Sequence, residues 1–138
     1  MRERRKKRKI PHRNRSPYGW WIASVLLRFE FFDEDRTKLN RRCLAWKNTV
    51  LLKARTRDEA YRKAVAAGHQ DAGGESWDAD TGRRGTFRFE GLTLLLPVHE
   101  QLEDGAEILW TEYSGRTVRR IKSMVVPKGK LPVFNDED

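Results

Sequence analysis

Residues 19–32 read GWWIASVLLRFEFF, and the alternation in this stretch decides the fold. Every second residue from position 21 to position 31 is apolar: Trp21, Ala23, Val25, Leu27, Phe29 and Phe31. The intervening positions are mixed and include Ser24, Arg28 and Glu30. Because side chains alternate between the two faces of a strand, one wholly apolar face predicts a β-strand that lies over a core.

The sequence after this strand predicts a second strand and then a helix. Residues 43–55, CLAWKNTVLLKAR, follow a polar connector and are expected to pair back antiparallel. Thr56 and Glu59 have the spacing of a capping box, in which a hydroxyl and a carboxylate accept hydrogen bonds from free amides at a helix start. An apolar stripe at helical spacing follows, and Gly68 is expected to end the helix in a left-handed conformation. We therefore predict a helix over residues 57–67.

Residues 69–85 are expected to form a long polar loop or a wide hairpin that leads into a third strand. That strand covers residues 86–98, TFRFEGLTLLLPV. Gly91 is a candidate bulge within it, and Pro97 marks its end.

Residues 106–114, AEILWTEYS, predict a fourth strand in which Ile108 and Trp110 share a face. A short helix is expected after Gly115, and residues 127–138 are expected to be irregular and acidic at the end. The order of elements favours an α+β fold: a mostly antiparallel four-stranded sheet, one main helix packed on a face, and a short C-terminal helix. A parallel crossover between the second and third strands is an alternative that the sequence leaves open.

The charge of the chain is concentrated at its N-terminus. The formal net charge is +9 over 138 residues, and residues 1–17 alone carry +8 of it. These residues hold one large aliphatic side chain, Ile10, so they have little to bury against the entropy cost of ordering. We therefore divide the chain into a disordered basic arm (1–17), a single α+β domain (18–126) and an irregular acidic tail (127–138).

The basic arm is the candidate nucleic-acid-binding site. Its cationic residues are Arg2, Arg4, Arg5, Lys6, Lys7, Arg8, Lys9, Arg13 and Arg15. Each cation that meets a phosphate releases a condensed counterion, whatever the base sequence. The arm has no aromatic residue to stack on bases, so it is expected to give affinity for a polyanion without sequence specificity. A tail that only aids solubility is the alternative.

The sequence offers little for catalysis, for a metal or for a membrane. The apolar run at residues 20–27 is too short for a membrane span and lacks an export cleavage site, so a cytoplasmic location is expected. Cys43 is expected to be a buried, inert thiol. No cofactor motif is present, and we expect neither a cofactor nor an enzymatic activity. Phe87 and Phe89 are expected to belong to the core, although residues 83–91 distantly resemble an RNA-binding strand.

The polar loop is the one place where an enzyme is conceivable. It gathers His69, Asp71, Glu75, Asp78 and Asp80. A catalytic or metal-binding role would require at least two of these side chains to meet in a pocket. In the same loop, Trp77 is the tryptophan expected to be exposed.

From residue 20 to about residue 125 the chain resembles an uncharacterised bacterial family, the domain-of-unknown-function family numbered 4288. The resemblance lies in the aromatic-led strand Trp20–Leu27, in which Trp21 replaces the usual Tyr, and in the Glu-Ala helix from Asp58 to Ala64. It also lies in the turn Asp104-Gly105-Ala106-Glu107, with Ser114 further on. The resemblance implies a small cytoplasmic α+β domain and brings no catalytic or ligand-binding residues.

Three hypotheses of function follow. The first is a binding module whose basic arm attracts nucleic acid or another polyanion. The second is an immunity-type or other protein-interaction module that binds one specific partner through its sheet face. The third is an enzyme that uses the acidic loop, residues 69–80.

Overall fold

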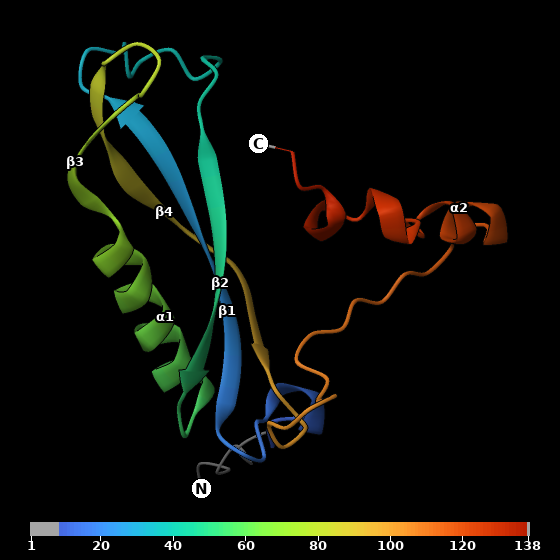
Figure 1. Ribbon diagram of the computed structural model, residues 1–138. Helices are drawn as coiled ribbons and strands as arrows, with labels where there is room; N and C mark the ends of the chain where they lie inside the picture. The colour runs from blue at the N-terminus through green and yellow to red at the C-terminus, as the bar shows by residue number, and fades with distance from the viewer. Residues whose placement is uncertain (1–8, 138) are drawn as a thin grey trace, which may run out of the picture.

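The computed structural model describes residues 9–137. In chain order, its elements are a 3-10 turn His12–Asn14, β1 Trp20–Phe31, β2 Ala45–Lys53, α1 Arg57–Asp71, β3 Gly73–Trp77, β4 Arg84–Pro97 and α2 Val118–Ser123, followed by 3-10 turns Lys128–Lys130 and Pro132–Phe134. A long twisted sheet carries α1 along one face, and α2 lies apart from the sheet (Figure 1). The predicted α+β class, with one main helix and one short helix, is confirmed.

The four strands form one sheet in the order β2-β1-β4-β3, and every neighbouring pair is antiparallel. The parallel crossover left open by the sequence is therefore not present in this sheet. β1 is one of the two inner strands: Trp20 to Arg28 pair with β2, and Trp21 to Phe31 pair with β4. Its predicted apolar face is buried from Trp21 to Phe29.

The fourth strand is not the one expected from the sequence. Residues 106–114 form no strand, and the fourth place in the sheet is taken by β3, which lies inside the predicted loop 69–85. β3 and β4 form the wide hairpin that was one of the two alternatives for this loop. A short strand rich in glycine and polar residues shows little alternation of apolar and polar side chains. For this reason β3, with the sequence GGESW, was not predicted as a strand.

The core is built where α1 crosses the sheet. Trp21, Ala54 and Ala60 form a buried cluster against which Leu52 and Leu95 pack. The indole Nε1 of Trp21 donates a hydrogen bond of 3.1 Å to the carbonyl oxygen of Ala54. This bond satisfies the single polar group of a side chain that is otherwise buried among apolar neighbours.

Helix α1 begins as predicted and ends later than predicted. Thr56 Oγ1 accepts from the amide of Glu59 at 3.1 Å, and the Glu59 carboxylate accepts from the amide of Arg55 at 3.3 Å. Gly68 does not end the helix, which continues to Asp71; the left-handed residues are Gly73 and Gly74, with φ of 87° and 69°.

Gly68 instead allows the helix to approach the sheet. Ala60, Ala64 and Gly68 are the buried residues of α1 and follow one another at intervals of four. A Cβ atom added at Gly68 would lie 2.3 Å from Cε2 of Phe89 on β4, which is far closer than two carbon atoms can pack. The glycine is therefore a packing residue, and its role depends on a contact that the local sequence does not reveal.

Strand β4 is irregular at the predicted bulge. Its register with β1 shifts between Ser24 and Val25 and again between Leu26 and Leu27, on either side of the pairing of Leu26 with Gly91. Gly91 has φ of 147°. These irregularities add to the twist of the two longest strands.

The segments outside the sheet leave from the end where β1 begins and β4 ends. Among residues 9–17, Ser16 Oγ donates to the carbonyl oxygens of Trp20 and Val98 at 2.6 and 3.2 Å, and the rings of His12 and His99 lie 5.0 Å apart. The C-terminal residues extend away from the sheet from this same end (Figure 1).

We predict that Gly68→Ala lowers the free energy of unfolding by about 1–2 kcal/mol. Overpacking against Phe89 costs about 3 kcal/mol, which outweighs a helix-propensity gain of about 1 kcal/mol. Urea titration measures the difference. The exposed Ala66→Gly on the same helix isolates the propensity effect, and Phe89→Leu in a double-mutant cycle should recover part of the loss. A Gly68→Ala protein more stable by the full propensity gain would contradict this packing.

Candidate functional site

The candidate site follows from a difference in length between β1 and α1. Twelve residues of strand span roughly 40 Å, whereas fifteen residues of helix span roughly 22 Å. The last turn of α1 reaches Phe89, where the His69 ring lies 4.9 Å from the Phe89 ring. Beyond this point the helix covers nothing, so the same face of the sheet continues without it.

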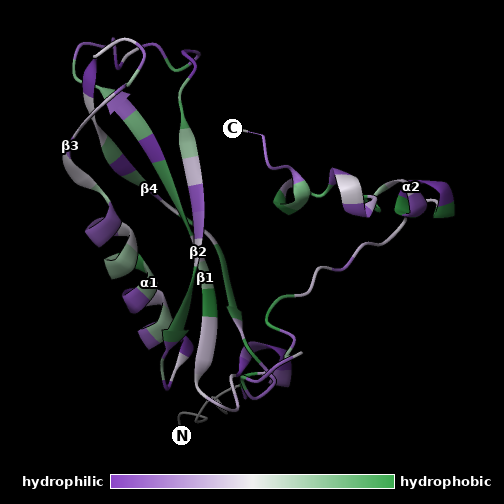
Figure 2. Ribbon diagram, viewed as in Figure 1, coloured by the Kyte–Doolittle hydropathy of each residue, from purple (hydrophilic) through white to green (hydrophobic). Residues whose placement is uncertain are grey.

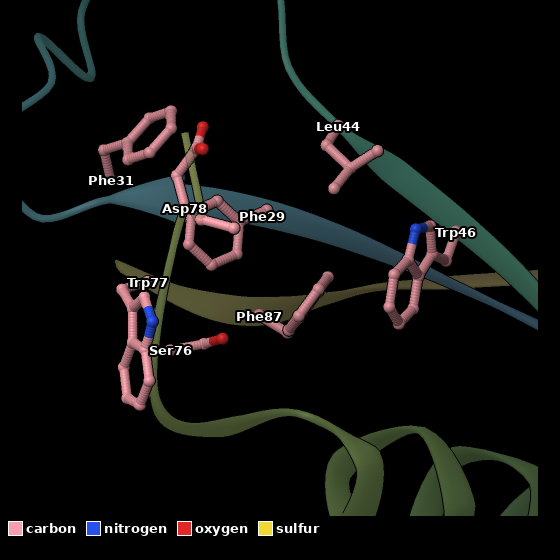
Figure 3. Close-up of a pocket in the computed structure, with 9 residues that line it drawn as sticks. Phe29, Phe31, Leu44, Trp46, Ser76, Trp77, Asp78 and Phe87 are labelled. Carbon is pink, nitrogen blue, oxygen red and sulfur yellow. The ribbon is translucent and has the colours of Figure 1, made fainter. Parts of the chain in front are cut away.

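An aromatic pocket of about 350 Å³ occupies this uncovered end of the face. Its lining residues come from all four strands and their connections: Phe29, Phe31, Leu44, Trp46, Ser76, Trp77, Asp78, Ala79 and Phe87. Figure 3 shows Trp46 and Trp77 on opposite sides of Phe29 and Phe87. The volume lies within the range of small-molecule sites, and the walls are mostly apolar, as such sites usually are.

The aromatic side chains support one another in place of the helix. The Phe87 ring lies 5.2 Å from the Phe29 ring in an edge-to-face arrangement and 4.9 Å from Trp46. Phe29 also meets Phe31 edge to face at 5.0 Å. These are favourable geometries for aromatic pairs. Trp46 and Trp77 nevertheless remain 51% and 69% exposed, so the pocket presents a large indole surface to solvent.

The polar groups of the pocket are few and mostly engaged. Asp78 Oδ1 accepts from the amides of Asp80 and Thr81 at 2.8 and 3.3 Å, which shapes the turn between β3 and β4. Ser76 contributes a hydroxyl from β3. Two such groups can orient a ligand, but they do not form a pair of acid and base across a reacting atom.

A cation already lies on one of the aromatic faces beside the pocket. The Arg83 guanidinium carbon lies 3.8 Å from the centre of the Phe31 ring. Its Nη2 also donates to Asp33 Oδ1 at 2.6 Å. This hydrogen bond lowers the pKa of the exposed Asp33 carboxyl below its ordinary value.

The opposite face of the sheet carries a buried carboxylate among arginines. The side chain of Glu30 is 5% exposed and contacts Arg88 Nε at 2.8 Å, Arg36 Nε at 2.5 Å and Arg28 Nη2 at 3.9 Å. The hydrogen bond from Arg88 is the main cause that lowers the pKa of Glu30, and it outweighs the opposing effect of burial. Glu30 is therefore a charged structural residue that holds three arginines on the outer face.

The predicted arm residues divide between described and undescribed parts of the chain. Arg2, Arg4, Arg5, Lys6, Lys7 and Arg8 lie outside the described residues. Lys9, Arg13 and Arg15 are exposed at the end of the sheet where β1 begins, which is the end opposite the aromatic pocket. The pocket and the arm are therefore two separate features.

Three carboxylates of the acidic loop have separate positions and partners. Asp71 ends α1, Glu75 on β3 pairs with Arg84 at 3.2 Å, and Asp78 shapes the turn. Within residues 9–137, no group of three or more His, Cys, Asp and Glu side chains is placed to hold a metal ion.

Cys43 is exposed, which corrects the expected buried thiol. It precedes β2, which begins at Ala45, so it is not covered as an interior strand residue would be. Phe87 and Phe89, which were expected in the core, lie on the helix-bearing face but are only half-buried, and Phe87 lines the pocket. Trp77 is exposed as predicted.

The pocket itself was not predicted from the sequence. The alternation in residues 21–31 places Phe29 and Phe31 on the apolar face over the core, and no sequence signal marks Trp46 as a pocket residue. The available signal was a difference in length: the apolar face of β1 is longer than the helix that was expected to cover it. Because the apolar face of β1 is longer than the helix, the aromatic residues at its far end are expected to be uncovered; no sequence motif indicates this.

The sheet, its single covering helix and the aromatic pocket define a small α+β domain. The model of the family described as "Domain of unknown function (DUF4288)" matches residues 20–110, and the chain belongs to this family. The predicted family resemblance is thereby confirmed. No curated protein and no solved structure gives a significant match. Across the described residues, no helix combines the length and apolar character needed to cross a bilayer.

Proposed function

We propose that this protein is a non-catalytic cytoplasmic binding module whose N-terminal arm attracts nucleic acid or another polyanion. The observation that carries the proposal is the division of charge, +8 in residues 1–17 against a total of +9. Lys9, Arg13 and Arg15 support it, because they take part in none of the ion pairs found among residues 9–137.

Six arginines of the domain, by contrast, form ion pairs with its own carboxylates: Arg28, Arg36, Arg41, Arg83, Arg84 and Arg88. Arg83 pairs with Asp33, Arg84 with Glu75, and Arg41 with Glu34. An internally paired guanidinium must break its ion pair before it can bind a phosphate, and this cost reduces the net free energy gained on phosphate binding. The arm is the part of the chain whose cations outnumber its single carboxylate, Glu3, by a wide margin.

The arm is expected to bind by counterion release. Contact with about six to ten phosphates would make the affinity fall about 10³- to 10⁵-fold between about 50 and 200 mM salt. Single-stranded and duplex nucleic acid of any sequence should bind in a comparable manner, because the arm reads charge and carries no aromatic group.

We predict that replacing Lys6, Lys7, Arg8 and Lys9 by glutamine weakens binding to a fluorescent oligonucleotide. The slope of log affinity against log salt should decrease by roughly 0.9 for each phosphate that the variant no longer neutralises. The matched control removes the same charge from exposed helical positions, with Arg57, Arg62, Arg119 and Lys122 changed to glutamine. Fluorescence anisotropy over a salt series measures both variants.

The control variant should keep most of the affinity and nearly the full slope. Equal losses of affinity in the two variants would mean that total charge, not the arm, governs binding. Unchanged affinity in the arm variant would remove the arm from the function altogether.

A second candidate function is supported by the aromatic pocket: recognition of one specific protein partner, as in an immunity-type module. Half-exposed tryptophans beside a pocket are typical of residues that anchor protein interfaces. The sequence favoured the sheet face for such contacts, and the pocket lies on the helix-bearing face of the sheet, beyond the end of α1.

For this candidate we predict that Trp46→Ala together with Trp77→Ala abolishes a stoichiometric complex with a protein encoded beside this one. Both side chains are at least half exposed, so the fold should survive, as circular dichroism would verify. Tyr61→Ala, an exposed aromatic change on α1, is the control and should leave the complex intact. Retention of the complex by the double tryptophan variant would contradict a role for the pocket.

A further inference from the structure

The C-terminal arm, defined here as residues 106–134, carries many apolar side chains and has no cover. Seven of these side chains are Ile108, Leu109, Trp110, Tyr113, Val118, Val126 and Phe134, each more than 45% exposed. Figure 2 shows apolar residues distributed along this arm, away from the sheet. An extended apolar surface of this kind on a folded protein usually marks an interaction site.

The first part of the arm has the pattern of a strand but no partner. In residues 106–113, AEILWTEY, one face carries Ile108 and Trp110 and the other carries Leu109 and Tyr113. The family match extends to Trp110, so most of this segment belongs to the unit that defines the family, although it lies outside the sheet.

The sheet offers an open edge of matching length. β2 stands first in the order β2-β1-β4-β3, so in the described part of the chain its outer edge is not paired with a strand. Its burial alternates from residue 47 to residue 53, with Lys47, Thr49, Leu51 and Lys53 exposed. An exposed edge with apolar side chains is a template for an added strand.

The segment and the edge are complementary in one antiparallel register. When residue 107 lies opposite residue 53, the outer face pairs Glu107 with Lys53 and Leu109 with Leu51. The next pair on this face is Thr111 with Thr49. Opposite charges, apolar pairs and Thr–Thr pairs are the cross-strand combinations that stabilise antiparallel sheets.

The other face of the added strand matches equally well in the same register. Ile108 lies opposite Leu52 and Trp110 opposite Val50, on the side of the sheet that carries α1. A parallel arrangement that keeps the apolar pairs, with Leu109 opposite Leu51, places Glu107 opposite Thr49 and so loses its pairing with Lys53. The pairing of opposite charges therefore favours the antiparallel register.

We propose that residues 106–113 of one copy add to the β2 edge of a second copy, and that the exchange is reciprocal in a two-fold dimer. The connector in this structure directs the segment away from its own sheet. The Val98 amide donates a hydrogen bond of 2.9 Å to the Trp20 carbonyl oxygen. The Glu107 amide donates one of 2.7 Å to Glu100 Oε2. A second copy supplies the same edge without opening this turn. The dimer is independent of the proposed polyanion binding.

The test uses two single-cysteine chains made in a Cys43→Ser background. One carries Leu51→Cys and the other Leu109→Cys, which are partly exposed positions that face each other in the proposed register. Co-expressed and gently oxidised, the two chains should form a covalent heterodimer on a non-reducing gel. Neither chain alone should do so efficiently, and Lys47→Cys with Leu109→Cys is the off-register control.

A parallel measurement is the sedimentation of the full chain. The wild type should sediment as a dimer. Leu109→Asp should make it a monomer, whereas Val133→Asp, at another exposed apolar position of the arm, should leave the dimer unchanged. Because Leu109 contributes nothing to the core, the variant should keep its fold.

Absence of the heterodimer disulfide, or a wild type that is monomeric at all concentrations, would overturn the proposal. So would a Leu51→Cys, Leu109→Cys double variant that forms its disulfide within one chain, because the segment would then cover its own edge. Capture of a different protein on the β2 edge with no self-association would also overturn it.

Discussion

The close approach of α1 to the sheet is the constraint on which the rest of the structure depends. Ala60, Ala64 and Gly68 present a line of minimal side chains, so the helix can lie directly on β1 and β4. A helix this close buries Trp21 and completes the core with few large residues. The same helix is too short to cover the whole of β1, so the far end of the face carries aromatic side chains that line a pocket open to solvent. The pocket is thus a consequence of how the core is built.

The distribution of charge follows a similar division of roles. Within the domain, six arginines form ion pairs with carboxylates, and three of these arginines contact the single carboxylate of Glu30 on the outer face of the sheet. Two opposite charges that lie close together produce little electrostatic potential at distances beyond a Debye length. The ion pairs therefore add little to the long-range potential of the domain. Residues 1–17 carry most of the excess positive charge. They precede β1, which begins at the end of the sheet opposite the pocket (Figure 1). The described part of this segment, residues 9–17, is therefore separated in space from the aromatic pocket.

The sequence predicts the elements whose signals are local. Alternation from Trp21 to Phe31 defines β1, and the Thr56–Glu59 spacing defines the start of α1. Prediction fails where the role of a residue depends on a contact with a residue that is distant in the chain. From the local sequence, Gly68 is expected to end the helix. In the structure a glycine is needed at this position because Phe89, on β4, packs too closely for a larger side chain. Residues 106–113 have the pattern of a strand, yet they pair with no strand among the described residues. The position of Trp46 at the pocket could not be predicted, because the sequence does not show where the helix stops covering the sheet.

The central claim is that α1 leaves the end of its sheet face open, with indole surface accessible to solvent. Fluorine NMR of protein labelled with 5-fluorotryptophan tests it most directly, through the change in each resonance between H₂O and D₂O. Trp46 and Trp77, which are 51% and 69% exposed, should show large solvent shifts, and Trp21, which is 3% exposed, should show almost none. Trp46 and Trp77 resonances as insensitive to solvent as that of Trp21 would contradict it.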